Sequence, residues 1–418
     1  MKKVLTLVLT LVLTLCILLA ATLPALAEDT LTVWFSGGVN GKAAEYAAQL
    51  YRQQHPDVTI NIEQVATSDR ETRLTVALTS GDMTGLPDIT LFQDYSAQRF
   101  LQFFPGCFTD LSAAIDMSEF APDKVGYWTY EGKTYALPFD SAASASFVRL
   151  DYLTEAGYTL ADLTDITWDR YIEIGKEVQA KTGRYMLTEM DYSNLLMVLV
   201  KSAATWYFNE DGSANIENNE GVRAALETIK KLHESGIVME NEDWAAYVAS
   251  MNEGKAASTV TGNWILGSIV GAADQSGLWG MTTVPSMGDD MGHYSSNGGS
   301  SWAVLSSSQQ QELAVDFLKT FMSDEFNEYL VKELATVPTY LPAQKLECVN
   351  EPYAFTNGQK VFADIMDYTA KTPVITYGPY NADAQSTMQL AVDQVLAGTS
   401  VDEALKTAQQ SMEFLMEE

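Results

Sequence analysis

The sequence predicts an α/β protein in which strands and helices alternate from one end to the other. Three observations support this class: the order of strand-like and helix-like segments, the length of the chain, and its composition. The chain has 418 residues, of which 47% are hydrophobic and 19% are charged. These values are typical of a soluble globular protein that is large enough for two domains and has no long disordered tails.

The first elements after the N-terminal leader predict a parallel sheet. In residues 29–38 (DTLTVWFSGG), apolar side chains alternate with other residues, as they do in a strand. Residues 41–56 carry apolar side chains at helical spacing, and residues 58–65 (VTINIEQV) are rich in β-branched residues, which favour strands. A strand, a helix and a second strand in succession form a βαβ unit, which implies parallel pairing.

The same alternation continues along the chain. Residues 70–82 predict a helix that stops at Gly81, and residues 86–92 predict a strand that runs into a polar loop. Further helices, marked by Thr, Asn or Gly at their ends, are predicted at 153–158, 167–183 and 218–238. A pair of helices is predicted at 306–334, and a closing helix at 400–418. Further strands are predicted at 254–264 and 279–290.

The N-terminus predicts export. A basic MKK, an apolar stretch at residues 4–21 and the small residues Ala25 and Ala27 form a secretory signal, with cleavage expected after Ala27. Retention of this segment as a membrane anchor is one alternative. Lipidation at Cys16 is another, although Leu15 stands where a lipoprotein signal has a small residue. No second apolar span of about 20 residues follows, so we do not expect the body to cross a membrane.

The charge and the motif content exclude several functions. The formal charge is −30, and loss of the leader with Lys2 and Lys3 makes it −32, so nucleic acid is not an expected partner. The three histidines form no zinc pattern, and neither a phosphate-binding loop nor a nucleophile elbow is present, so we expect no cofactor, no metal and no enzymatic activity. A carboxylate pair of the glycosidase kind stays open. A disulfide between Cys107 and Cys348 also stays open.

Aromatic residues are frequent where predicted strands end. These residues include Trp34, Trp206, Tyr207, Trp244, Trp264, Trp302, Tyr340 and Tyr377. Indole and phenol rings bind the flat C–H faces of sugars, and ligands of open α/β sheets bind beyond the carboxyl ends of strands. In residues 253–267 (EGKAASTVTGNWILG), Trp264 follows a predicted strand directly. Its ring therefore either faces a ligand or packs between the strand and the next helix.

Several segments, in this order and spacing, resemble the extracellular solute-binding proteins of ABC importers, in particular the sugar-binding type similar to maltose-binding protein. The likeness covers almost the whole chain after the leader. It is carried by a Gly-Asp…Pro-Asp strand segment, a Gly-Lys…Tyr-Ala-Leu-Pro stretch, a Thr-Trp-Asp helix start, a Gly-Lys-Ala-Ala strand leading to Gly-x-Trp, and a proline-bounded crossover with a glycine pair. These stand at residues 78–94, 130–158, 167–178, 247–264 and 282–340.

The resemblance implies a two-lobed periplasmic-binding-protein-like fold of type II with discontinuous lobes and an interdomain hinge. Residues 1–27 would be the signal peptide, 28–139 plus 288–338 the N-terminal lobe, and 140–287 plus 339–418 the C-terminal lobe. The ligand, a mono- or oligosaccharide, would bind in the cleft, and closure about the hinge would deliver it to permease subunits in the membrane. The protein would act as a monomer.

Matching the chain to the family residue by residue implies a set of ligand-binding positions. The expected set is Trp34, Ser36, Gly37, Gly38, Asp94, Tyr95, Phe139, Asp140, Trp206, Asn263, Trp264, Gly298, Gly299, Ser300, Trp302, Tyr340 and Tyr377. Alternatives stay open: a receptor of the same fold for a polyamine, a peptide or another small solute, and a secreted carbohydrate-active enzyme. The chain also lacks the lipobox of many family members, which leaves the way it is held at the cell surface open.

Overall fold

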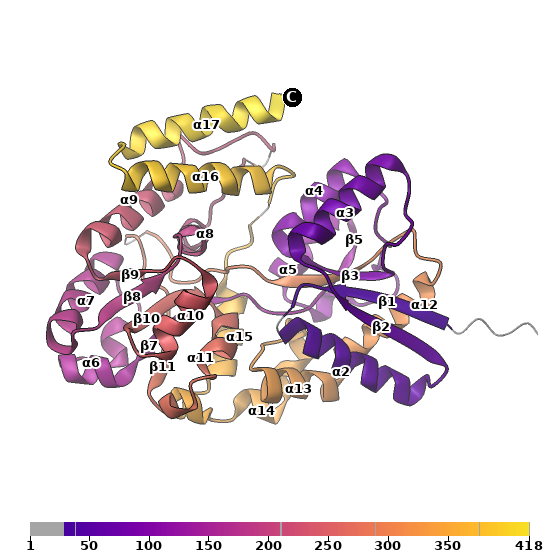
Figure 1. Cartoon of the computed structure of the whole chain (residues 1–418), viewed down its shortest axis with the longest axis horizontal. Helices are drawn as coiled ribbons and strands as arrows, with labels where there is room; N and C mark the ends of the chain where they lie inside the picture. The colour runs from indigo at the N-terminus through magenta and orange to yellow at the C-terminus, as the bar shows by residue number, and fades with distance from the viewer. Residues whose placement is uncertain (1–28, 38, 210, 289, 376, 418) are drawn as a thin grey trace, which may run out of the picture.

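The computed structural model describes residues 29–37, 39–209, 211–288, 290–375 and 377–417. These residues form two α/β lobes that lie side by side, each built around a five-stranded sheet (Figure 1). The predicted α/β class is therefore confirmed. The predicted leader, with Ala27 and Cys16, lies outside the described residues.

The N-terminal sheet has the strand order β2-β1-β3-β12-β6. Its first three strands, β1 (Asp29–Phe35), β2 (Val58–Gln64) and β3 (Ile89–Gln93), are parallel, and they are joined by α2 (Val39–Gln54) and α3 (Thr67–Ser80). This is the predicted βαβ unit and its continuation. The strand β12 (Ser300–Val304) comes from much later in the chain and pairs antiparallel with β3 and with β6 (Ala136–Pro138).

The C-terminal sheet has the strand order β11-β7-β10-β8-β9. Its central strand β10 (Ala256–Gly262) is parallel to β8 (Tyr185–Glu189) and antiparallel to β7 (Ser144–Arg149). The edges are β11 (Trp279–Thr282) and β9 (Val238–Glu240). All residues of β10 are buried, so the small and β-branched residues that predicted this strand lie in the interior of the C-terminal lobe.

Helices surround both sheets (Figure 1). In the N-terminal lobe these include α4 (Ala97–Phe103), α5 (Pro122–Tyr127), α12 (Gln311–Leu318) and α13 (Asp324–Leu334). In the C-terminal lobe they include α6 (Leu150–Ala156), α7 (Trp168–Thr182), α8 (Ser193–Ser202), α9 (Glu220–Ser235), α10 (Trp244–Asn252) and α11 (Leu266–Ile269). The last two helices, α16 (Asn381–Leu396) and α17 (Val401–Glu417), pair with each other and pack on α9.

Helix ends follow the capping signals of the sequence. The Thr167 hydroxyl accepts a hydrogen bond from the Arg170 amide at the start of α7, and Gly183 ends that helix in the left-handed conformation. The Asn219 side chain caps α9 in the same way, because its oxygen accepts from the backbone amides of the first turn. Polar caps satisfy amides that have no partner within the helix, which explains why these residues mark its start.

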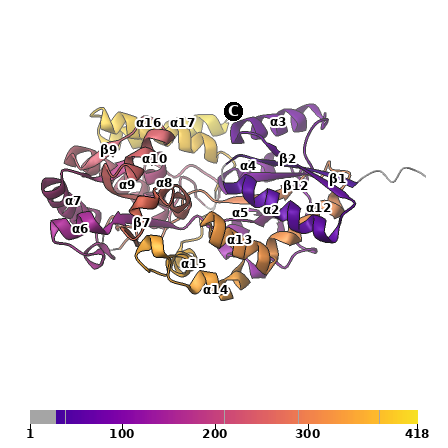
Figure 2. The ribbon, with the colours of Figure 1, turned by 60° about the horizontal axis from the view of Figure 1, so that its bottom comes forward.

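The chain passes between the two lobes three times: between β6 and β7, between β11 and β12, and after α13. After the third crossing, α14 (Glu347–Asn350) and α15 (Val361–Lys371) lie along the underside of the molecule next to α13 (Figure 2). The predicted lobe boundaries at 139/140, 287/288 and 338/339 stay a prediction.

Two further observations bear on expectations from the sequence. Cys107 and Cys348 are both buried and both free, so the described structure contains no disulfide between them. Within the described ranges, no helix has both the length and the apolar character needed to cross a membrane.

Candidate functional site

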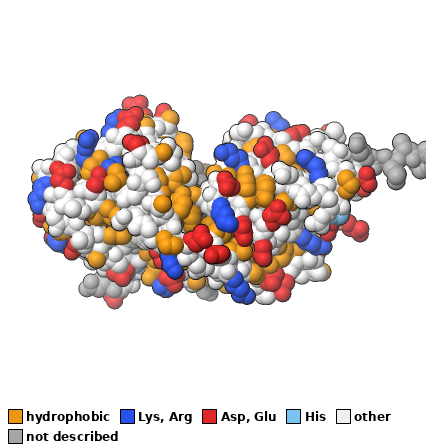
Figure 3. All heavy atoms as spheres, turned by 90° about the horizontal axis from the view of Figure 1, so that it is seen from below, with side chains coloured by type: hydrophobic (Ala, Val, Ile, Leu, Met, Phe, Trp, Pro, Cys, Tyr) orange, Lys and Arg blue, Asp and Glu red, His pale blue; other side chains and the backbone are white. Residues whose placement is uncertain are grey.

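A cavity of about 420 Å³ lies between the two lobes. The N-terminal lobe contributes residues from the start of α2 and the end of β3, and the C-terminal lobe contributes residues from α8, α16 and the end of β10. The crossing segments supply Asp140 and residues 297–300. The space-filling view shows a notch between the lobes and apolar side chains along their boundary (Figure 3). A cavity shared by two lobes is suited to a small ligand that both lobes contact.

The structure brings six of the residues expected at the site onto the wall of this cavity. They are Tyr95, Asp140, Trp264, Gly298, Gly299 and Ser300. These residues come from both lobes and from two of the crossings, so the fold collects them from four distant parts of the sequence. Gly38, which was also expected at the site, lies outside the described residues.

Trp264 reaches the cavity because the chain turns sharply after β10. Gly262 ends the strand, and the indole folds back over it so closely that a Cβ atom at this position would collide with the Trp264 Nε1 atom. That Nε1 atom donates a hydrogen bond of 2.8 Å to the backbone oxygen of Asn297, in the second crossing. The ring is therefore half-buried and held in place while it lines the cavity.

A second indole extends this aromatic surface outward. Trp244, the first residue of α10, has its ring centroid 5.6 Å from that of Trp264 with 44° between the planes. The Asp243 side chain accepts from the Ala246 amide and caps the helix, which fixes the position of Trp244 at its start. The Trp244 side chain remains 45% exposed. The two rings form one aromatic surface that begins in the cavity and ends at the solvent.

Most polar side chains that line the cavity are neutral amides. They come from both lobes and from the second crossing: Asn40, Gln93, Asn194, Asn297, Gln385 and Gln389. Asp140 is the one charged side chain among the described lining residues. Its Oδ1 atom accepts hydrogen bonds from the Ser300 amide (2.7 Å) and hydroxyl (2.8 Å), and burial raises its pKa. The cavity thus offers many uncharged donors and acceptors and little net charge.

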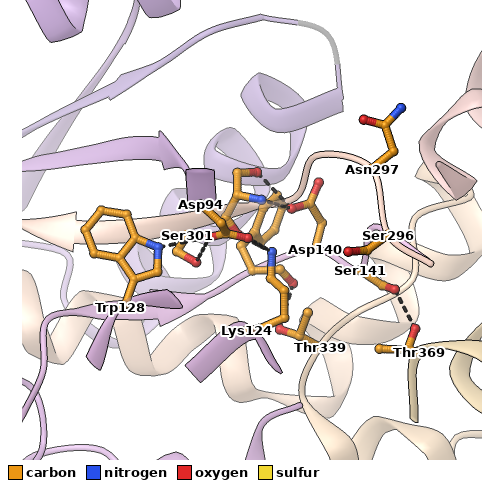
Figure 4. Close-up of polar contacts among 12 residues, drawn as sticks. Asp94, Lys124, Trp128, Asp140, Ser141, Ser296, Asn297, Ser301, Thr339 and Thr369 are labelled. Carbon is orange, nitrogen blue, oxygen red and sulfur yellow. Dashed lines mark hydrogen bonds and ion pairs between the residues drawn. The ribbon is translucent and has the colours of Figure 1, made fainter. Parts of the chain in front are cut away.

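A buried ion pair supports the floor of the cavity. Lys124 donates to Asp94 Oδ2, and Asp94 Oδ1 accepts from Trp128 Nε1 (2.9 Å) and the Ser301 hydroxyl (2.6 Å) (Figure 4). Gly299 covers this network from the cavity side. A Cβ atom at Gly299 would collide with the Lys124 ammonium and lie 2.9 Å from Asp94 Oδ2.

This geometry corrects the expectation that Asp94 binds the ligand directly, since Asp94 is not among the described residues that line the cavity. The side chain is fully buried, and both of its oxygens already have protein partners. An ion pair without access to water needs such partners to offset desolvation. Asp94 therefore stabilises the floor of the cavity and is not available to a ligand. Its contribution to the site is the position of Gly299 and Ser301.

Other expected site residues lie in the hydrophobic cores. Trp302 follows Ser301 on β12, and successive side chains of a strand point to opposite faces, so its ring enters the N-terminal core. Phe139 packs against that ring with centroids 5.7 Å apart. Trp34 is 4% exposed and donates to Glu63 Oε2 at 2.9 Å. None of these three side chains is among the described residues that line the cavity.

Four more expected residues, Ser36, Gly37, Tyr340 and Asn263, are not among the described residues that line the cavity. Ser36 and Gly37 lie near Gln64, which donates to the Ser36 oxygen at 3.3 Å. Tyr340 packs on Phe120, with ring centroids 5.3 Å apart. Asn263 is buried, and its backbone amide donates to the Ala143 backbone oxygen in the first crossing.

Trp206 and Tyr377 lie next to a buried lysine, Lys201, that no sequence pattern marks. Lys201 lies 4.9 Å from the ring centroid of Tyr377, 5.6 Å from that of Trp206 and 5.8 Å from that of Tyr127. It also donates to the Ser296 hydroxyl at 3.1 Å. Burial lowers its pKa to about 7, although Asp123 and Asp94 oppose this shift. Trp206 and Tyr377 thus pack around a cation where the lobes meet.

The lining residues that sequence reasoning missed are mainly the amides. Asn194 lies on α8 and Gln385 and Gln389 lie on α16, and these helices are far apart in the sequence. Spacing of i and i+4 places Gln385 and Gln389 on one face of α16, but a pair of glutamines on a helix is also typical of a solvent-facing surface. No local signal separates the two cases.

Comparisons with known proteins identify the family. Residues 46–357 match the family of bacterial extracellular solute-binding proteins. The lactose-binding protein of Rhizobium radiobacter is 37% identical over 381 residues, which cover 90% of both chains. The arabinooligosaccharide-binding protein of Bacillus subtilis is 24% identical and covers 81% of both chains.

Two solved structures support the architecture. The GacH receptor of Streptomyces glaucescens has a TM-score of 0.79 at 20% identity, covering 94% of this chain and 99% of its own. The galacto-N-biose-/lacto-N-biose I-binding protein of Bifidobacterium longum has a TM-score of 0.76 at 20% identity, covering 94% and 98%. These likenesses confirm the two-lobed binding-protein fold. The chain belongs to the bacterial extracellular solute-binding proteins.

Proposed function

We propose that the protein binds a neutral carbohydrate in the cavity between its lobes and delivers it to the permease of an ABC importer. The observation that carries this proposal is the cavity wall, whose described residues combine the Trp264 indole with six side-chain amides and a single carboxylate. An indole suits the flat face of a sugar ring, and amides suit hydroxyls, which both donate and accept. The lactose-binding and arabinooligosaccharide-binding relatives support the same ligand class.

Binding would favour the closed arrangement of the lobes. Asn40 and Tyr95 face the cavity from the N-terminal lobe, whereas Trp264 and Gln389 face it from the C-terminal lobe. A ligand that contacts both walls is held fully only when the lobes are close together, so it shifts the population toward closure. A micromolar dissociation constant corresponds to about −8 kcal/mol, which one stacked ring and several hydrogen bonds can supply after ordering costs.

The remaining expectations form part of the same proposal. The lobes would divide at 139/140, 287/288 and 338/339, and the protein would be exported as a monomer, with its leader cleaved after Ala27. It would bind its ligand without chemical conversion. A glycosidase needs two carboxyl groups flanking the scissile bond, and the described lining residues supply only Asp140.

The polyamine alternative finds aromatic rings but one carboxylate among the described residues of the wall. A polyamine carries several positive charges, which in a protein are matched by carboxylates or aromatic faces. The oxygen Oδ1 of Asp140 already accepts two hydrogen bonds from Ser300, so this carboxylate is weakly suited to be the main partner of a cation.

A thermal-shift screen of the purified mature protein tests the proposal. The panel contains lactose, maltose, galactobiose and arabino-oligosaccharides, with spermidine and a short peptide as controls. We expect at least one neutral sugar to raise the melting temperature and to be recovered unchanged after incubation. Stabilisation by spermidine alone, or hydrolysis of a stabilising sugar, would refute it.

A further inference from the structure

We propose that Gln389 and Asn194 are specificity-determining residues that recognise hydroxyls of the ligand, with Gln389 as a fixed acceptor and Asn194 as a donor. This inference rests on the proposed function and goes beyond it, because it assigns hydrogen-bonding roles to two side chains that sequence reasoning missed. It derives from the hydrogen bonds that orient each amide group.

The amide of Gln389 can take only one orientation. Its Nε2 atom donates to the backbone oxygen of Asp191 (2.9 Å) and to Asp393 Oδ1 (3.1 Å). Rotating the amide by half a turn would place its oxygen against two acceptors, which removes two hydrogen bonds and adds repulsion. The nitrogen therefore faces Asp191 and Asp393, and the oxygen is the atom left over.

The Gln389 oxygen has no hydrogen-bond partner among the described residues, and it is buried. The residue itself lines the cavity between the lobes. A buried acceptor without a partner costs about 1–3 kcal/mol, so native proteins rarely keep one without a reason. A ligand hydroxyl that donates to Gln389 Oε1 would remove this cost upon binding.

The amide of Asn194 is oriented in the opposite sense. Its Oδ1 atom accepts from Asn297 Nδ2 at 3.0 Å, and Asn297 Nδ2 also donates to the Thr261 hydroxyl at 3.2 Å. Because the Asn194 oxygen is engaged, its Nδ2 group is the free end, and it donates to none of the described residues. Asn194 therefore presents a donor on the same cavity wall.

The two amides are tied to the same turn. Gln389 bonds to Asp191, whose side chain accepts from the Ser193 amide at the start of α8. Asn194 is the next residue of that helix. The helix α16 and the start of α8 are thus joined through Asp191, and both Gln389 and Asn194 line the cavity.

This arrangement distinguishes sugars by their hydroxyl groups. A hydroxyl that donates to Gln389 and a second hydroxyl oxygen that accepts from Asn194 satisfy both amides together. A sugar that lacks one of these hydroxyls leaves a buried polar group unpaired, which is penalised more strongly than the loss of apolar contact. The pair therefore selects for sugars that carry both hydroxyls.

A double-mutant cycle between the protein and the ligand tests the inference. Isothermal titration calorimetry compares lactose, or the sugar that stabilises best in the screen, with the full set of its monodeoxy derivatives. Wild-type protein is expected to bind at least two of the derivatives about tenfold more weakly. Gln389→Met should lose about tenfold for the parent sugar and be indifferent to removal of one of those hydroxyls.

Asn194→Asp provides the second variant. It keeps the oxygen that Asn297 donates to and removes the free donor, so it should become indifferent to the other hydroxyl. Gln394→Met, on the same helix but outside the described cavity wall, serves as the matched control and should keep the wild-type pattern. The melting temperature of each ligand-free variant reports any general loss of structure.

The outcomes separate the two proposals. If wild-type protein binds no sugar of the panel, the proposed function fails, and this inference fails with it. If wild-type protein binds a sugar but both variants keep the wild-type preference among the derivatives, the proposed function stands and the role of Gln389 and Asn194 is refuted. A merely structural role would weaken all the sugars equally, which would also refute it.

Discussion

Replacing Trp264 with alanine separates the roles of this ring in binding and in folding. The side chain is half-buried, makes one hydrogen bond to Asn297 and lines the cavity. Truncating an aromatic anchor in a binding site typically costs about 2–4 kcal/mol, so we expect affinity to fall by about 30- to 1,000-fold.

The cost in stability should be much smaller. Loss of one neutral hydrogen bond and of part of the apolar burial amounts to about 2 kcal/mol. At about 2–4 °C per kcal/mol for a chain of more than 150 residues, the ligand-free melting temperature should fall by about 4–8 °C at most.

Trp302 is the matched control for this experiment. It is fully buried in the N-terminal core, so Trp302→Ala should cost about 3–5 kcal/mol without touching the cavity wall. The assays are calorimetric titration with the best sugar and differential scanning calorimetry without ligand. If Trp264→Ala lowers stability as much as Trp302→Ala and leaves affinity unchanged, Trp264 is a core residue and the site is wrongly assigned.

Three further predictions concern a glycine and two buried ionisable groups. Gly262→Ala should displace the Trp264 ring, because the new Cβ would collide with Trp264 Nε1 and lie 2.7 Å from Trp264 Cδ1. We expect at least tenfold weaker sugar binding by titration, and an unchanged affinity would contradict this prediction. Burial raises the pKa of Glu189 from 4.5 to about 8. The folded protein therefore keeps this proton while the unfolded chain loses it, and the free energy of unfolding falls as the pH rises from about 4.5 to 8. Relative to Glu189→Gln, wild-type protein should therefore melt at progressively lower temperature between about pH 4.5 and 8, and parallel melting curves would refute this. Burial lowers the pKa of Lys201 from 10.5 to about 7, so relative to Lys201→Met the wild type should gain stability as pH rises from about 7 to 10.5, and a constant difference would refute it.

Local patterns predicted the elements well because their physical causes are local. Alternation in β1, β-branched residues in β2 and β10, and the caps Thr167 and Asn219 all act within a few residues of where they are read. The sequence also predicted that Trp264 follows a strand, and Trp264 lines the cavity at the end of that strand.

The chemistry of the wall depended on contacts that no local pattern encodes. Asp94 follows a strand and resembles a ligand acceptor, but Lys124, Trp128 and Ser301 come from elsewhere in the chain and occupy its oxygens. Trp302 could have been assigned to the core, since strand alternation places it opposite Ser301. Gln389 carries no such clue, because its role depends on partners almost two hundred residues away.

The most direct test of a neutral sugar bound between the lobes is calorimetric titration of the mature wild-type protein at low and at high ionic strength. A neutral ligand held by amides and an indole should bind with micromolar or tighter affinity that barely changes with salt. Absence of sugar binding, or an affinity that falls steeply as salt is added, would contradict the account.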